Sequence, residues 1–190
     1  AQPGSFIHPS TPVLYLSQGQ ESSISTDLLE TIIVSDVRSF AQDPRFCLSV
    51  MAEIACRALS PAVNDPGTAI DVIGRGVRIL SAYAQNKSDE IEVKYPSVHV
   101  APLQNNDLLE DFFSPVARDG ASMREIQIRV LKGLSMLSKG WPGIFAEAAQ
   151  TLAFETLEHA TRADHIDSDR YLIKSIYYNL FSGEDSNKKP

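Results

Sequence analysis

Two Asp-Pro pairs constrain the fold of this chain more than any other feature of its sequence. They are Asp43-Pro44 and Asp65-Pro66. Aspartate is a favoured N-cap because its carboxylate accepts hydrogen bonds from the free N–H groups at a helix start. Proline suits the first helical position, where its missing N–H costs nothing. The pairs therefore predict two helices, one over residues 44–60 and one over residues 66–85.

The segment between these helices is predicted to be a tight corner. Ser60-Pro61 stops the first helix, because a residue before proline is disfavoured in the helical region. Asn64 tolerates the left-handed conformation that such a chain reversal needs. Each polar residue of the corner thus has a role in the backbone, and no nucleophile–base pair is visible. We predict no catalytic residue.

Apolar residues at helical spacing continue through the rest of the chain. With Ser122 and Gly140-Trp141-Pro142 as start signals, they predict further helices. These helices are expected near residues 25–34, 107–115, 122–139, 140–163 and 168–181. The chain is therefore predicted to be mainly α, a helical bundle of about seven helices.

Two short β-prone runs, Phe6-Ile7 and Val13–Leu16, precede the helices. Prolines around them confine such strands to edges, and two strands alone are marginally stable. We expect a small N-terminal β appendage whose partner strands lie upstream, and a short β-hairpin near residues 90–102. The predicted domains are a partial β segment at 1–20, a helical domain at 21–183 and a disordered tail at 184–190.

The composition narrows the classes of partner. The formal net charge of −7 argues against a nucleic-acid surface, which needs clustered Lys and Arg. The two cysteines, Cys47 and Cys56, lie on opposite faces of one predicted helix and cannot bond to each other, which suits a reducing compartment. No stretch is apolar enough to span a membrane, and no secretory signal is present. The chain lacks an initiator Met, so we expect it to be a piece of a longer protein.

The helix predicted at 44–60 carries one conspicuous charged pair, Glu53 and Arg57. Because most of the remaining circumference is apolar, we expect this helix to be central in the bundle. The pair would then be a buried structural ion pair. Alternatively, Arg57 and the next helix N-terminus would form an anion-binding pocket, although Asp65 would repel an anion. The candidate ligand-binding or structural residues are Glu53, Arg57, Ser60, Asn64, Asp65 and Thr68.

The helix predicted at 66–85 contains two glycines, Gly74 and Gly76. Glycine weakens a helix, so we expect these positions to allow the close approach of a neighbouring helix. Its polar side carries Asp71, Arg75 and Arg78, which are expected to be solvated. The carboxylates and histidines between residues 155 and 165 do not follow a zinc-binding pattern, so we predict no metal and no cofactor.

The segment Asp43 to Ile73, DPRFCLSVMAEIACRALSPAVNDPGTAIDVI, resembles the signature of a family of bacterial predicted membrane proteins, domain of unknown function 2254. The opening PGSFIHPSTPVLYL is similar to the family's P-G-x-F-V-x-x-G-T-P-L segment, with Ser10 where glycine is usual. The residues that match the signature are Arg57, Ala58, Leu59, Ser60, Pro61, Asn64, Asp65, Pro66, Thr68 and Ala69.

The resemblance implies a soluble C-terminal portion of a bacterial inner-membrane protein, attached to a membrane part of four spans and facing the cytoplasm. The family has no established activity, so the resemblance implies no catalytic residue. We expect a regulatory or assembly role, with the transmembrane part of the same chain and a homo-oligomer as partners and without nucleic acid. The alternative is a small-ligand-binding or hydrolytic site at the Arg57–Thr68 corner.

Overall fold

The computed structural model describes residues 2–13, 15, 30, 32–41, 43–87 and 102–181. The described part of the chain is mainly α, as predicted, and its elements are six helices. They are α2 (Pro44–Leu59), α3 (Pro66–Gln85), α4 (Asn105–Asp119), α5 (Arg124–Gly140), α6 (Pro142–Arg162) and α7 (Asp167–Phe181).

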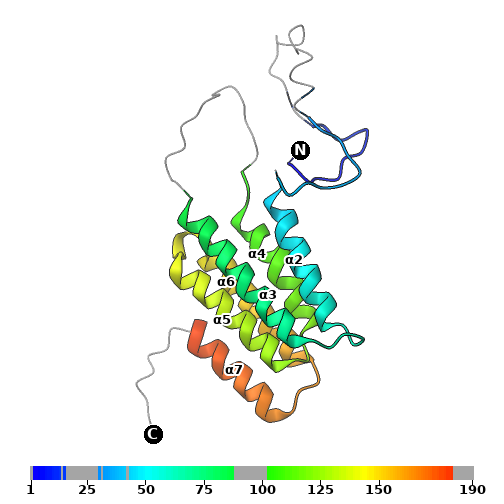
Figure 1. Ribbon diagram of the computed structural model, residues 1–190. Helices are drawn as coiled ribbons and strands as arrows, with labels where there is room; N and C mark the ends of the chain where they lie inside the picture. The colour runs from blue at the N-terminus through cyan, green and yellow to red at the C-terminus, as the bar shows by residue number, and fades with distance from the viewer. Residues whose placement is uncertain are drawn as a thin grey trace.

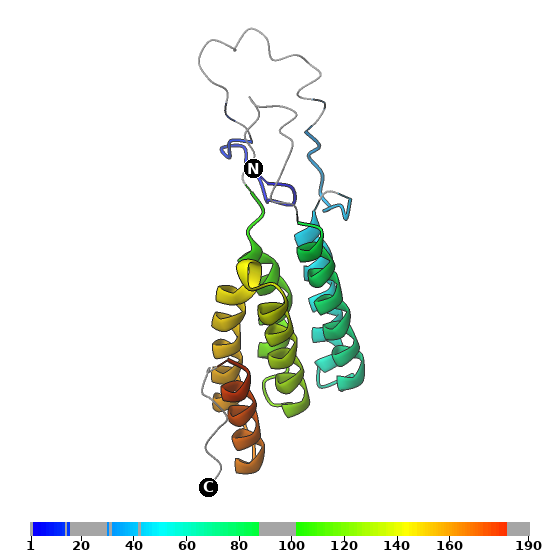
Figure 2. The same ribbon diagram turned by 90° about the vertical axis from the view of Figure 1, so that its left-hand side faces the viewer.

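The helices form three successive pairs, α2–α3, α4–α5 and α6–α7, stacked side by side (Figures 1 and 2). One row of the stack runs α2, α4, α6 and the other runs α3, α5, α7, while α5 also packs along α6. Figure 2 shows the α2–α3 pair on one side of the stack and α6 and α7 on the other. Among the described helices the α2–α3 pair is therefore terminal, and none of the others packs against its outer face.

The predicted count of seven helices and the β appendage are wrong for the described residues. Residues 2–13 and 15 contain no strand, and residues 32–41 contain no helix. Prolines at 3, 9 and 12 remove ladder donors, and Gly4 has a φ of 78° that regular strands do not use. The rest of the helix expected near 25–34 and the hairpin expected near 90–102 lie almost wholly outside the described residues.

Aromatic rings from α4 fill the centre of the stack. Phe112 and Phe113 are fully buried and meet edge to face, with ring centroids 4.9 Å apart. The Phe112 ring lies where a Cβ at Gly76 of α3 would be, so the expected close approach is confirmed at Gly76. Gly74 instead faces open space. Beyond the proline, Val116 and Ala117 are buried, which explains why α4 runs through Pro115 to Asp119 instead of ending there as predicted.

Candidate functional site

The corner between α2 and α3 is held by its own side chains, as predicted. The Ser60 hydroxyl donates to the Arg57 carbonyl oxygen at 2.7 Å, and Asn64 has a φ of 49°. The Asp65 carboxylate accepts hydrogen bonds from the Thr68 hydroxyl at 2.5 Å and the Thr68 N–H at 3.1 Å. These two bonds hold the pKa of Asp65 below its usual value. The corner is therefore a stable connection between two helices, with three of its polar side chains occupied.

Glu53 and Arg57 do not form the buried ion pair that we expected. Both side chains are exposed, and within the described residues no ion pair joins them. The expectation of a central helix was also wrong, because α2 belongs to the terminal pair and, among the described helices, packs mainly on α3 and α4. Its uncovered face carries Glu53, Arg57 and the half-exposed Ile54. The corner thus brings Ser60, Asp65 and Thr68 together, while Arg57 and Glu53 point to solvent.

A cleft with a volume of about 420 Å³ lies beside the corner, along the exposed side of α3. Its wall on α3 consists of Gly67, Ile70, Asp71, Gly74, Arg75 and Arg78. Arg129 of α5 also lines the cleft. Arg75 donates to Asp71 at 2.7 Å, whereas Arg78 and Arg129 have no hydrogen bond or ion pair to any described residue. The cleft therefore gathers three guanidinium groups and one carboxylate.

The sequence had placed Arg75 and Arg78 on a solvated face, and it did not single out Arg129. No local pattern connects Arg129 with α3, since the two helices are separated by the whole of α4. In the tertiary structure α3 and α5 are packed neighbours, and Gly133 of α5 lies close to Val77 of α3. A Cβ at Gly133 would lie 2.9 Å from a Val77 methyl carbon.

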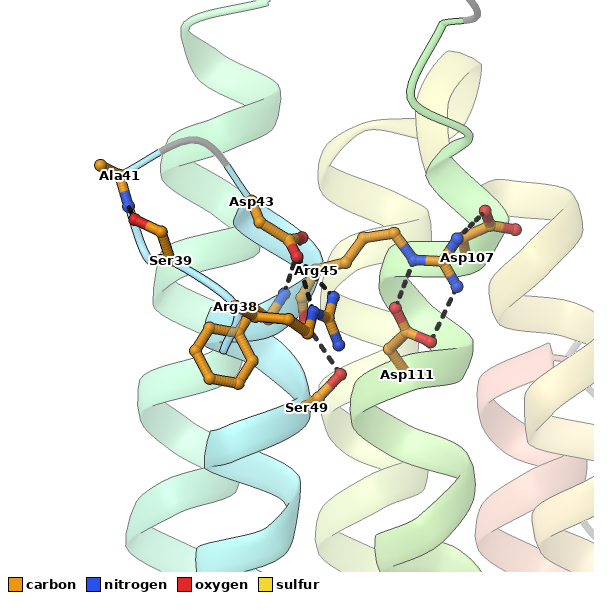
Figure 3. Close-up of polar contacts among 9 residues, drawn as sticks. Arg38, Ser39, Ala41, Asp43, Arg45, Ser49, Asp107 and Asp111 are labelled. Atoms are coloured by element: carbon orange, nitrogen blue, oxygen red, sulfur yellow. Dashed lines mark hydrogen bonds and ion pairs between the residues drawn. The ribbon is translucent and has the colours of Figure 1, made fainter. Parts of the chain in front are cut away.

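A second polar cluster lies at the opposite end of α2, where the N-terminal segments meet the helices (Figure 3). Asp43, only 3% exposed, accepts from the Arg38 guanidinium at 2.7 Å and from the Phe46 N–H at 3.0 Å. The backbone of Gly4 lies so close that a Cβ there would overlap the Asp43 carboxylate. The Arg38 guanidinium also lies 4.9 Å from the centroid of the Phe46 ring. Asp43 therefore anchors two connecting segments on the start of α2.

Arg45 extends this cluster from α2 to α4 (Figure 3). Its guanidinium donates to both carboxylate oxygens of Asp111, at 2.6 and 3.0 Å, and to Asp107 at 2.6 Å. The Asp111 hydrogen bond is the main cause that raises the pKa of Arg45 above its usual value. A planar guanidinium suits such a bidentate arrangement. We name the side chains of Arg38, Asp43, Arg45, Asp107 and Asp111 the anchor cluster.

Cys56 is the cysteine nearest the corner, and its environment does not activate it. Partial burial, followed by the Asp119 carboxylate, raises the pKa of the Cys56 thiol to about 12. Because a nucleophilic cysteine must be a thiolate, this side chain stays neutral at physiological pH. Any stability linked to the neutral thiol is present below the ordinary pKa of 9.0 and is lost as the pH rises towards 12.

This raised pKa predicts a slow reaction with iodoacetamide. In a Cys47→Ser variant, we expect the alkylation rate of Cys56 to keep increasing up to about pH 11 without a plateau, since the thiolate stays the minor form. The urea-unfolded chain serves as the control and should level off above an ordinary thiol pKa. Mass spectrometry measures both rates. A plateau near pH 9 in the folded chain would contradict the assignment.

The described residues contain no group of three or more His, Cys, Asp and Glu side chains arranged to hold a metal ion. The buried His165 has a structural partner instead, since its Nε2 lies 2.8 Å from the Ala121 carbonyl oxygen. None of the helices in the described part of the chain combines the length and apolar character that a membrane span requires.

Comparison with known proteins places these features in a family context. Residues 1–136 match the family described as "Predicted membrane protein (DUF2254)". The uncharacterized proteins Rv1290c of Mycobacterium tuberculosis (strain ATCC 25618 / H37Rv) and Mb1321c of Mycobacterium bovis (strain ATCC BAA-935 / AF2122/97) are each 61% identical over 36 residues. That stretch covers 19% of this chain and 7% of each relative. No solved structure matches this chain.

Proposed function

Because the chain belongs to the DUF2254 family of predicted membrane proteins, we propose that it is an extramembrane helical domain with a regulatory or assembly role for the membrane part. In this proposal it faces the bacterial cytoplasm at the inner membrane. Its partner is the transmembrane part of the same protein. The two cysteines are free thiols, which agrees with a reducing compartment.

One observation carries this proposal. Large apolar side chains are exposed on both segments that the anchor cluster holds against the helices. Phe6 is 95% exposed, and the others lie between residues 33 and 40. These are Ile33, Val34, Val37 and Phe40. Leaving large apolar side chains in water is unfavourable, so five of them on these two segments favour an interaction surface. We name the five side chains the apolar end and assign it to contact with the membrane part.

The anchor cluster gives this contact a route into the helices. Arg38 and Gly4 bring the two N-terminal segments onto Asp43, and Arg45 links the start of α2 to α4. A displacement at the apolar end would therefore act on α2 and α4 through charge-assisted hydrogen bonds. Such a connection is what a domain that responds to, or acts on, a membrane part requires.

Amide hydrogen exchange tests the proposed contact. We expect the amides of residues 2–13 and 32–41 to exchange about tenfold more slowly when the chain is attached to its membrane part than in the isolated chain. The corner at residues 60–65, at the other end of α2, should not change and is the internal control. Equal protection at both ends, or at neither, would contradict the proposal.

A matched pair of variants sharpens this test. Val37→Ser on the apolar end should reduce the added protection, because it removes a 77% exposed apolar side chain from the proposed interface. Tyr171→Ser removes a 76% exposed side chain from α7 and should leave the protection unchanged. Light scattering of the isolated chain examines the assembly role. A strict monomer at high concentration would oppose a homo-oligomer built by this domain.

The alternative function is a ligand-binding or hydrolytic site at the Arg57–Thr68 corner. It is favoured by the exposed Arg57 side chain and by the cleft that begins nearby at Gly67. Hydrolysis by Ser60 would require its hydroxyl to leave the Arg57 carbonyl oxygen, which is not a base. The variant Arg57→Gln distinguishes the two places, since it should weaken a ligand bound at the corner and leave a ligand bound in the cleft unaffected.

A further inference from the structure

The geometry points to a ligand site that the regulatory proposal does not use: we infer that the cleft between α3 and α5 binds a phosphate group. The inference stands on the cleft alone and is independent of any contact at the apolar end. The ligand would be a small phosphorylated molecule or the headgroup of an anionic lipid, since both present the same phosphate chemistry.

The charge of the cleft is opposite to that of the chain. Three guanidiniums and one carboxylate line the cleft, whereas the chain carries a formal net charge of −7. Asp71 pairs with Arg75, which leaves Arg78 and Arg129 without an anionic partner among the described residues. Two unpaired guanidiniums on facing helices attract an anion between them, because each offers a planar set of donors that suits phosphate oxygens.

The shape of the cleft suits a ligand larger than a single ion. Its volume of about 420 Å³ lies in the range that small-molecule sites occupy. Gly74 has no atom within 4 Å of the position that a Cβ would take, so the wall stays open there. Ile70 provides an apolar surface on the same wall. A phosphate between the arginines would therefore leave room for an attached organic group.

The arginines, and not the helix N-terminus, must supply the binding energy. A helix start commonly binds anions through its free N–H groups. At α3 the Asp65 carboxylate already accepts the Thr68 N–H and hydroxyl, and its negative charge would repel a second anion there. The favourable position is therefore further along α3, where Arg78 of α3 and Arg129 of α5 both line the cleft.

Calorimetric titration of the 190-residue chain with inorganic pyrophosphate tests this site directly. We expect the chain to bind pyrophosphate with an affinity that falls as salt is added. The substitutions Arg78→Gln and Arg129→Gln should each lower this affinity about tenfold. The control Arg162→Gln removes an arginine side chain of α6 that is 76% exposed and paired with Glu158, and it should change affinity less than twofold. The fold of each variant is checked by its thermal melting.

Asp71→Asn gives a test of opposite sign, which misfolding cannot mimic. It removes the one carboxylate of the cleft and frees Arg75, so pyrophosphate should bind about three- to tenfold more tightly. Arg57→Gln should leave affinity unchanged. If Arg57→Gln loses binding while the Arg78→Gln/Arg129→Gln double variant binds fully, the ligand binds at the corner and the inference of a site in the cleft is wrong.

Vesicles distinguish the two sources of phosphate. Co-sedimentation with phosphatidylglycerol vesicles, lost in the double variant and absent with phosphatidylcholine, would assign the cleft to a lipid headgroup. Pyrophosphate binding without vesicle binding would assign it to a free phosphorylated ligand. If neither probe binds, or if the double variant binds both as well as the natural chain does, the inference is wrong.

Discussion

Arg45→Ala is expected to lower the free energy of unfolding by about 2–3 kcal/mol. The substitution removes three short hydrogen bonds and leaves Asp107 and Asp111, one turn apart on α4, without their shared cation. A fully buried pair would cost more to break, but these side chains are 21–33% exposed, and water lowers the cost. Urea unfolding followed by circular dichroism measures the change.

Two further variants define the origin of this effect. Arg45→Lys keeps the charge but cannot make the bidentate contact with Asp111, so about half of the loss should remain. Arg75→Ala removes an exposed i,i+4 ion pair with Asp71 and should cost less than about 0.5 kcal/mol. If Arg45→Ala costs no more than Arg75→Ala, the anchor cluster does not stabilise the domain.

Gly76→Ala is expected to lower the free energy of unfolding by about 2 kcal/mol, although alanine is intrinsically the better helix former. The added methyl group would overlap the ring of Phe112, which is fully buried and in contact with Phe113. The cost of moving this ring exceeds the gain in helix propensity. Gly74→Ala on the same helix meets no neighbouring atom and should raise the free energy by about 0.5–1 kcal/mol.

A double-mutant cycle identifies the ring as the cause. In a Phe112→Leu background, the smaller side chain leaves space at Gly76, so the cost of Gly76→Ala should fall below about 1 kcal/mol. Unfolding in urea gives all four free energies. An unchanged cost in that background would show that Phe112 is not the limiting contact. If Gly74→Ala and Gly76→Ala had equal effects, the packing of α3 against α4 would be wrong.

The predicted effects on stability and on ligand binding arise at separate places on the α2–α3 pair. The anchor cluster joins the start of α2 to α4, and Gly76 lets α3 pack against the same helix. The arginine cleft lies on the exposed side of α3, away from both contacts. Substitutions in the cleft can therefore test ligand binding with little change in stability, because Arg78 and Arg129 are exposed and make no bond to a described residue.

Local chemistry was sufficient to predict most helix bounds. Both Asp-Pro pairs start helices, and Asp43 and Asp65 cap them as expected. Asn64 adopts the left-handed conformation at the corner. Such signals work because a cap or a turn satisfies N–H groups within three or four residues, so neighbouring residues alone set the preference. The family resemblance rested on the same stretch and is confirmed by the match over residues 1–136.

Long-range packing determined the features that the sequence did not reveal. Arg45 lies 62 residues from Asp107, and only the stacking of α2 on α4 brings them together. The same stacking puts α2 at the end of the structure, so Glu53 and Arg57 meet solvent although their helix is mostly apolar. Pro115 stays within α4 because burying Val116 and Ala117, which follow it, outweighs the lost hydrogen bond.

The sequence by itself therefore determined where helices begin and turn, whereas the tertiary structure alone decided which of their faces meet a neighbour. Helix starts depend on hydrogen bonds between residues close in the chain. The arginine cleft depends on which surfaces the stacked pairs leave uncovered. Which surfaces are covered depends on packing between side chains of different helices, such as the Phe112 ring of α4 against Gly76 of α3. Such residues are far apart in the sequence and share no local pattern that would reveal their contact.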